Sequence, residues 1–234
     1  MVKVQFTKTP SSGKYIVTAF QTIGYISILA AKYLEEKGAI QEIGFVDLED
    51  NVPIAMIIDG AVKFPIRVLE GQSTIFITSE FPIQSKNLVD LATEIFNLSK
   101  KYEAKGIIAL DGLAIENPKS ESEVFYVSTG GSAQVAGAKK LEDGVMMGLN
   151  AELALKAKLL KIPTTILMAE THSNIPDGIA AAALINVLGN ITKMAVDTTE
   201  LVSEYKKTVE KINDTVRKMK QKEQPQTSGS DIYG

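Results

Sequence analysis

The feature that most constrains the fold is an alternation of short apolar runs with longer amphipathic segments along most of the chain. The run GIIALDG is apolar up to its aspartate, which is typical of a strand covered on both faces. Strands are predicted at 14–20, 42–48, 106–112, 122–129 and 162–170, with a hairpin around 70–72. Helices are predicted at 23–38, 84–104, 148–161 and 176–195, the last beginning at Pro176. This alternation predicts an α/β fold in which a layered, largely parallel sheet is flanked by helices.

The overall charge and composition narrow the possible partners. The net charge is −3 and the pI is about 5.4, so no global positive field attracts nucleic acid or an anionic membrane. The apolar stretches are shorter than the roughly 20 residues that a membrane span needs, and the first ten residues do not resemble a signal peptide. The chain has no cysteine, which fits a reducing compartment. We therefore expect a soluble, cytoplasmic protein that binds neither nucleic acid nor membrane.

The character of the sequence changes at residue 197, where a terminal helix is predicted over 197–222. Asp197 is placed as its N-cap, with Glu200 three residues later as a capping-box partner. The apolar residues of this segment recur at intervals of three and four, as in a coiled-coil seam: Val202, Tyr205, Val209, Ile212, Val216 and Met219. Two interpretations stay open, because the seam could lie along its own domain or meet other subunits. The predicted organisation is an α/β core domain (1–196), this amphipathic helix (197–222) and a tail (223–234).

The tail has the composition of a flexible linker, yet it ends in two apolar side chains. Residues 223–231 read EQPQTSGSD and offer nothing to bury. As a random coil, the segment 223–234 would span roughly 19 Å. Ile232 and Tyr233 then precede Gly234. Two such exposed apolar side chains either have no function or bind in a pocket on another molecule.

Candidate catalytic chemistry is sparse. The single histidine, His172, lies between Glu170 and Asp177 after a predicted strand, where open α/β sheets tend to bind ligands. Acid–base catalysis there is one interpretation, and a turn whose polar groups cap the next helix is the simpler one. No second histidine or cysteine completes a transition-metal site, and no G-x-S-x-G elbow is present. We therefore assign no catalytic residue and no metal site.

The glycine-rich stretch STGGSAQVAGAKK (128–140) resembles a phosphate-binding loop only superficially. Five residues separate Gly131 from Gly137, and alanine rather than Lys-Ser/Thr follows Gly137. Lys139 and Lys140 are expected to be solvated. Asp111-Gly112 is interpreted as a turn signal after a strand. No cofactor is predicted.

Several segments resemble the archaeal branch of the proteasome assembly chaperone family. They are the strand IPTTILMAET, the helix PDGIAAAALINVL with Asp177 ahead of an alanine run, the segment VDTTEL at the start of the terminal helix, and the strand–helix unit AFQTIGYISILAAKYLEEK followed by EIGFV. The similarity runs over most of residues 14–205. One departure is the first turn, AFQTIGYIS, where only Gly24 remains of a turn that is richer in glycine in the family. If that turn binds a ligand in some relatives, we expect that it does not here.

The resemblance implies a fold related to purine nucleoside phosphorylases, without catalysis, and a homo-oligomer such as a tetramer or pentamer. It also implies binding to proteasome α-subunits. The ending IYG looks like the hydrophobic–Tyr–X ending with which assembly chaperones and activators dock between α-subunits, so Ile232, Tyr233 and Gly234 are the predicted partner-binding residues. Two alternatives stay open. One is an oligomeric relative that binds another protein, and the other is a nucleoside-phosphorylase-like enzyme that uses the turn at 170–177.

Overall fold

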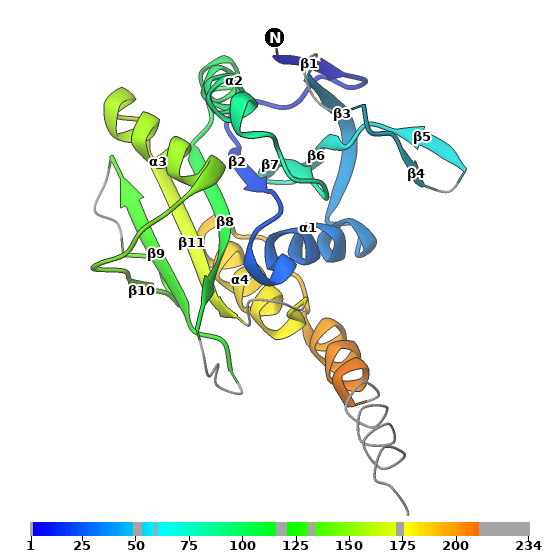
Figure 1. The fold of residues 1–234 in the computed structure, drawn as a ribbon, viewed down its shortest axis with the longest axis vertical. Coiled ribbons are helices and arrows are strands. Elements are labelled where there is room, and N and C mark those ends of the chain that lie inside the picture. The colour runs from blue at the N-terminus through cyan, green and yellow to red at the C-terminus, as the bar shows by residue number, and fades with distance from the viewer. Residues whose placement is uncertain are drawn as a thin grey trace, which may run out of the picture.

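The structure is a computed structural model, and it describes residues 2–48, 53–58, 60–115, 121–130, 134–171 and 176–210. Within these ranges a large sheet lies between two layers of helices (Figure 1). A two-stranded hairpin, β4 (Met56–Ile58) with β5 (Ala61–Lys63), extends from one end of the sheet.

The main sheet has nine strands in the order β1-β3-β6-β7-β2-β8-β11-β9-β10. Their bounds are β1 Val2–Phe6, β2 Tyr15–Ala19, β3 Ile40–Leu48, β6 Ile66–Gly71, β7 Thr74–Ser79, β8 Gly106–Ala114, β9 Val124–Thr129, β10 Lys139–Lys140 and β11 Thr164–Thr171. The four central strands β7, β2, β8 and β11 run parallel to one another. The predicted strands and the hairpin at 70–72 are all present.

The sheet is mixed, so the expectation of a largely parallel sheet was wrong. The pairs β1–β3, β3–β6, β6–β7 and β9–β11 are antiparallel. The tight turn between β6 and β7 makes β6 antiparallel to the parallel strands, and β3 and β1 extend that antiparallel side. Each strand was predictable from its own residues, but its direction depends on a partner that is distant in the sequence.

Helices cover both faces of the sheet. On one face lie α1 (Ile26–Glu36) and α4 (Gly178–Thr192), and on the other lie α2 (Leu88–Lys101) and α3 (Gly148–Leu160). Short 3-10 turns precede α1 and α2 at Ile23–Tyr25 and Ser85–Asn87. Among the described residues, no helix has both the length and the apolar character needed to span a bilayer.

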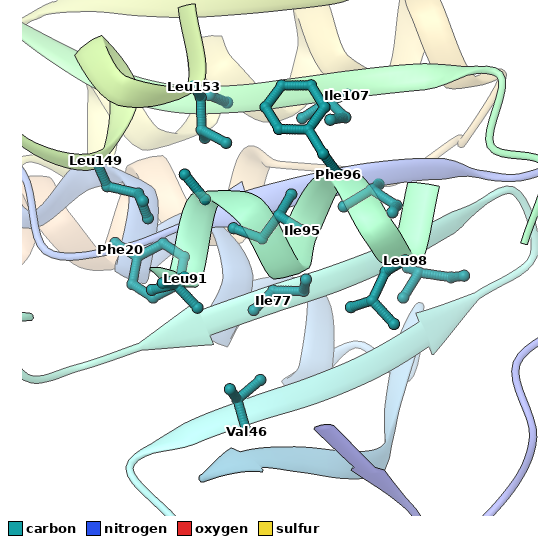
Figure 2. Close-up of a cluster of buried hydrophobic side chains, with 14 of the residues drawn as sticks. Phe20, Val46, Ile77, Leu91, Ile95, Phe96, Leu98, Ile107, Leu149 and Leu153 are labelled. Atoms are coloured by element: carbon teal, nitrogen blue, oxygen red, sulfur yellow. The ribbon is translucent and has the colours of Figure 1, made fainter. Parts of the chain in front are cut away.

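Alternate residues of the central strands feed two separate hydrophobic layers, because successive side chains of a strand point to opposite faces. Ile107 belongs to the layer under α2 and α3, and Ile108 to the layer under α1 and α4. Figure 2 shows the first layer, in which Ile95 and Phe96 of α2 lie over Ile107 and neighbouring strands. Full burial of each large side chain contributes about 1.5–3 kcal/mol, which explains why the run 106–110 is apolar throughout.

The helix α4 begins two residues later than predicted. Its first residue is Gly178, and the N-cap is Asp177, whose carboxylate accepts hydrogen bonds from the amides of Ile179 and Ala180, each at 3.0 Å. Pro176 therefore precedes the cap instead of opening the first turn. A side chain that can accept two amide hydrogen bonds fixes the start of a helix more strongly than proline's restricted φ does.

Candidate functional site

The C-terminal helix begins on the surface of the core domain. Residues 199–210 are helical, and 210 is the last described residue, so the rest of the helix predicted over 197–222 lies outside the described residues. Asp197 is the cap: its carboxylate accepts from the amide of Thr199 at 2.9 Å and from the Thr199 hydroxyl at 2.6 Å. These hydrogen bonds lower the pKa of Asp197.

Residues of α1 hold the start of this helix. The hydroxyl of Tyr33 donates to the carbonyl of Asp197 at 2.8 Å, and Lys37 forms an ion pair with Glu200. The capping-box role predicted for Glu200 was therefore wrong, because its carboxylate is bound to Lys37 from another helix. Leu201 packs on the hydrophobic layer under α1 and α4.

Tyr205 is the second point of attachment. A Cβ added to Gly178, at the start of α4, would lie 2.7 Å from Cβ of Tyr205 and 3.0 Å from its Cγ. Burial, with a smaller effect from the nearby Asp177 carboxylate, raises the pKa of the Tyr205 hydroxyl above its ordinary value. The side chain of Tyr205 therefore packs directly against Gly178, where any larger residue would clash with it.

Beyond this attachment, the helix points away from the layered body (Figure 1). Of the predicted seam, Val202, Tyr205 and Val209 are described, and all three are half-buried. Of these three, Tyr205 contacts its own core at Gly178, and both interpretations of the whole seam stay predictions. The predicted docking residues Ile232, Tyr233 and Gly234 lie outside the described residues.

The turn at 170–177 is described only at its two ends, because 172–175, which includes His172, lies outside the described residues. Besides capping α4, Asp177 accepts from the buried hydroxyl of Thr171 at 3.1 Å. Its amide donates to the carbonyl of Gly24 at 3.1 Å. One carboxylate oxygen of Glu170 is buried with no hydrogen-bond partner among the described residues. The described contacts of Asp177 fit the capping interpretation of this turn.

A cavity of about 670 Å³ opens where β2 and β8 end. We call it the β2–β8 cavity. Its walls are formed by residues 20–23 after β2, by 111–113 of β8, by the loop 141–147, and by the first two turns of α3, with Val127 and Met168 beside them. Phe20 and Leu149, which line it, lie near each other at one end of the hydrophobic layer drawn in Figure 2.

This cavity lies at the switch point of the sheet. From β2 the chain passes through α1 on one face, and the next parallel strand, β7, lies on one side of β2. From β7 it crosses through α2 on the opposite face to β8, on the other side of β2. Because these two connections lie on opposite faces of the sheet, they leave a crevice outside the carboxyl ends of β2 and β8. Open α/β sheets bind ligands in such a crevice.

Asp111 is the ionisable group inside the β2–β8 cavity. Its Oδ1 accepts from the amide of Gly112 at 2.8 Å, and its Oδ2 accepts from Nδ2 of Asn150 on α3 at 2.8 Å. Burial raises the pKa of Asp111, and these two hydrogen bonds oppose the rise. Among the described residues, no cation forms an ion pair with this carboxylate, whose ionised form is costly to bury without a partner.

The turn between β2 and α1 lies directly on β8. A Cβ on Gly112 would approach the carbonyl oxygen of Ile23 to 2.5 Å, so only glycine allows this contact. The hydroxyl of Ser27, which bonds Thr22, donates to the carbonyl of Leu110 at 2.9 Å and ties the same turn to the strand.

The sequence did not point to this cavity. Asp111-Gly112 carried the interpretation of a turn, although β8 continues through both residues to Ala114. The available signal was an acidic residue inside an apolar strand, which is unusual unless it has a partner or a function. Its main partner, Asn150, is 39 residues further along the chain.

Among the described residues, no group of three or more acidic or histidine side chains could hold a metal ion. The glycine-rich stretch is described at 128–130 and 134–140, and the Lys139 ammonium forms an ion pair with Glu123 at 2.8 Å. Lys139 and Lys140 are exposed, as predicted.

The layered arrangement defines a mixed α/β protein of the doubly wound class, with a C-terminal helix that leaves the core. The sequence profile of the PAC2 family matches residues 16–216. The chain belongs to the PAC2 family. No match was found among curated proteins.

Solved structures share this fold. The chain is 24% identical to Pyrococcus furiosus PbaA, described as an archaeal homolog of proteasome-assembly chaperone, with a TM-score of 0.83 and 93% of each chain covered. It is 16% identical to P. furiosus PbaB, described as an archaeal proteasome activator, with a TM-score of 0.77 over 92% of this chain and 98% of that one. A Mycobacterium tuberculosis proteasome-assembly chaperone homologue, Rv2125, gives 16% identity and a TM-score of 0.66 over 86% of this chain and 95% of that one.

Proposed function

We propose that this protein is a proteasome assembly chaperone or activator-like factor that binds proteasome α-subunits through Ile232, Tyr233 and Gly234. The observation that carries the proposal is membership of the PAC2 family over residues 16–216. Similarity in fold to PbaA and PbaB, whose descriptions name proteasome assembly and proteasome activation, adds support.

Each docking residue has a distinct physical role in the proposal. Tyr233 supplies a large, rigid ring at low entropic cost and one hydroxyl for a hydrogen bond. Ile232 buries a branched aliphatic group, worth up to about 3 kcal/mol when fully covered. The carboxylate of Gly234 pairs with a cationic group in the pocket, a charge-assisted contact that requires a free chain end.

The base of the C-terminal helix supports a role in presenting the tail. Asp197, Glu200 and Tyr205 hold the helix to α1 and α4, while residues up to 210 extend away from the body. The last described turn of the helix therefore lies away from the body, and residues 211–234 follow it in the sequence. Binding by this route needs no catalysis, cofactor or metal.

Several tails are required for useful affinity, because one short peptide loses much of its binding energy to ordering. We therefore propose a homo-oligomer, a tetramer or pentamer, that presents its C-termini to a ring of α-subunits and gains affinity through effective concentration. Sedimentation or light scattering at micromolar concentration tests this. A monomer at every concentration would contradict the multivalent arrangement.

The test of docking is a pull-down of purified proteasome α-rings with four forms of the full chain. They are the unchanged protein, Tyr233→Ala, a form with one residue appended after Gly234, and Ser230→Ala as a matched change in the same tail. We expect loss of binding for Tyr233→Ala and for the extended form, and retained binding for Ser230→Ala. All four forms should have the same melting temperature.

Equal binding by all four forms refutes docking through the terminal tripeptide. No binding by any form would point instead to the oligomeric relative that binds another protein. Cleavage of a nucleoside that disappears on His172→Ala would support the enzymatic alternative.

A further inference from the structure

The lining of the β2–β8 cavity has an unusual combination of apolar surface and uncompensated negative charge. Among the described residues that line it, there is no lysine, arginine or histidine. The three ionisable residues in the described part of the lining are acidic: Asp111 inside, and Glu142 and Asp143 in the exposed loop at its mouth. Such a field repels phosphate and carboxylate ligands and attracts cations.

Most of the remaining wall is apolar. The apolar lining residues are Phe20, Ile23, Leu113, Val127, Leu141, Val145, Met146, Met147, Leu149, Ala151, Ala154, Leu155 and Met168. Of these, Val145 is 95% exposed and Met147 is 83% exposed, so apolar side chains continue from the interior to the rim. A volume of about 670 Å³ falls within the range of small-molecule sites.

Two of the lining residues, Asp111 and Gln21, carry acceptor oxygens with unused hydrogen-bonding capacity. The Asp111 carboxylate is held by one hydrogen bond to each oxygen, from Gly112 and from Asn150, and each oxygen can accept at least one more. Gln21 also lines the cavity, and its Oε1 is buried with no hydrogen-bond partner among the described residues. Rotation of its terminal amide would let that oxygen meet a donor inside the cavity.

We propose that the β2–β8 cavity is a binding site for a small organic cation, with its apolar body in the cavity and its ammonium or guanidinium group on Asp111. The cation supplies the charged partner that the carboxylate lacks among the described residues, and charge-assisted hydrogen bonds fix its orientation. Gln21 supplies a second acceptor for the same group. Phosphorylated ligands, which the switch point of many α/β sheets accepts, are excluded by the acidic lining.

This proposal does not depend on docking to proteasomes. A purely structural role for Asp111, which would be to hold α3 through Asn150, is the alternative to be separated from it. That role requires no ligand and predicts no preference for positive charge. The test therefore compares ligands of one shape and three charges.

The experiment is calorimetric titration of the full chain with n-hexylammonium, hexanol and hexanoate. We expect the ammonium to bind at least tenfold more tightly than hexanol, because its hydrogen bond to the Asp111 carboxylate joins two opposite charges, whereas the hydroxyl of hexanol is a neutral donor. Hexanoate should bind most weakly. Comparable binding of hexanoate and hexylammonium, or no measurable binding of any probe, would overturn the proposal.

Variants locate the site. Asp111→Asn should lower the affinity for hexylammonium at least tenfold and leave that for hexanol unchanged, whereas Asp90→Asn, an exposed change on α2, should alter neither. Ala151→Leu fills the cavity without touching Asp111 and should weaken both ligands, which keeps the test decisive if Asp111→Asn does not fold. Unchanged ammonium affinity in folded Asp111→Asn, or in Ala151→Leu, refutes the site.

Discussion

The contact between Tyr205 and Gly178 allows a quantitative test of how the C-terminal helix is held. We consider Gly178→Ala in the unchanged protein and in a Tyr205→Gly background. The φ of Gly178 lies outside the left-handed region, so the backbone itself accepts alanine. The obstacle is Tyr205, whose Cβ and Cγ lie 2.7 Å and 3.0 Å from the added Cβ. Because these atoms adjoin the helix backbone, the tyrosine cannot simply rotate away.

Two opposing terms set the expected free energies of unfolding. Alanine in place of glycine favours a helix by up to about 1 kcal/mol. Overpacking costs about 1–3 kcal/mol when side chains or backbone must shift. In the unchanged protein we therefore expect a net loss of up to about 2 kcal/mol, limited by the free energy of docking this helix. In the Tyr205→Gly background, which lacks both the Cβ and the Cγ of the tyrosine, the clash disappears, and we expect Gly178→Ala to give a gain of up to about 1 kcal/mol.

The measurement is a double-mutant cycle by urea denaturation of the four proteins, with an expected coupling of about 1–3 kcal/mol between the two sites. Spectrophotometric titration of tyrosine provides a second measurement. In Gly178→Ala the pKa of Tyr205, now raised by burial, should fall back toward its ordinary value as the helix moves away. Additive effects together with an unchanged tyrosine titration would refute the attachment.

Three further perturbations test other parts of the structure. Asp177→Ala should lower the free energy of unfolding by about 0.5–2 kcal/mol, because two amides of α4 lose their cap; an unchanged denaturation midpoint would contradict this. Gly112→Ala should cost about 1–3 kcal/mol, because its Cβ meets the Ile23 carbonyl, and it should also abolish hexylammonium binding; a stable variant that still binds would contradict it. Although burial raises the pKa of Glu70, the 2.8 Å contact with Lys14 brings it below 4.5 overall, so its stabilising effect is present above pH 4.5 and lost on further acidification. Glu70→Gln should therefore show a shallower loss of stability below pH 4.5, and parallel acid profiles would contradict this.

Local patterns in the sequence were enough to place the individual elements. Alternation with period two or an unbroken apolar run located strands such as β8 and β11, and spacing of three and four located α1 and α2. The cap at Asp197 was also predictable, since capping depends on neighbours in the chain. Glu200 was misassigned because its partner, Lys37, lies 163 residues away.

The same distinction explains the candidate sites. Ile232, Tyr233 and Gly234 were found from the sequence because a terminal motif is contiguous, and their role remains a prediction. The β2–β8 cavity was missed because it is assembled from the ends of two strands and the start of α3. Asp111-Gly112 by itself resembles a turn, and the acidic residue in an apolar strand gained a structural context only from its burial and from the absence of a cation beside it among the described residues.

The sequence by itself determined where strands and helices form, that the central strands are apolar on both faces, and where the C-terminal helix starts. Periodicity and capping are properties of neighbouring residues, so they can be read without knowledge of the fold. Only the tertiary structure decided the mixed strand order, the switch point that opens the cavity, and the contact of Tyr205 with Gly178. These features depend on which distant segments pack together, and the free energy of that packing belongs to pairs of surfaces that no local stretch contains.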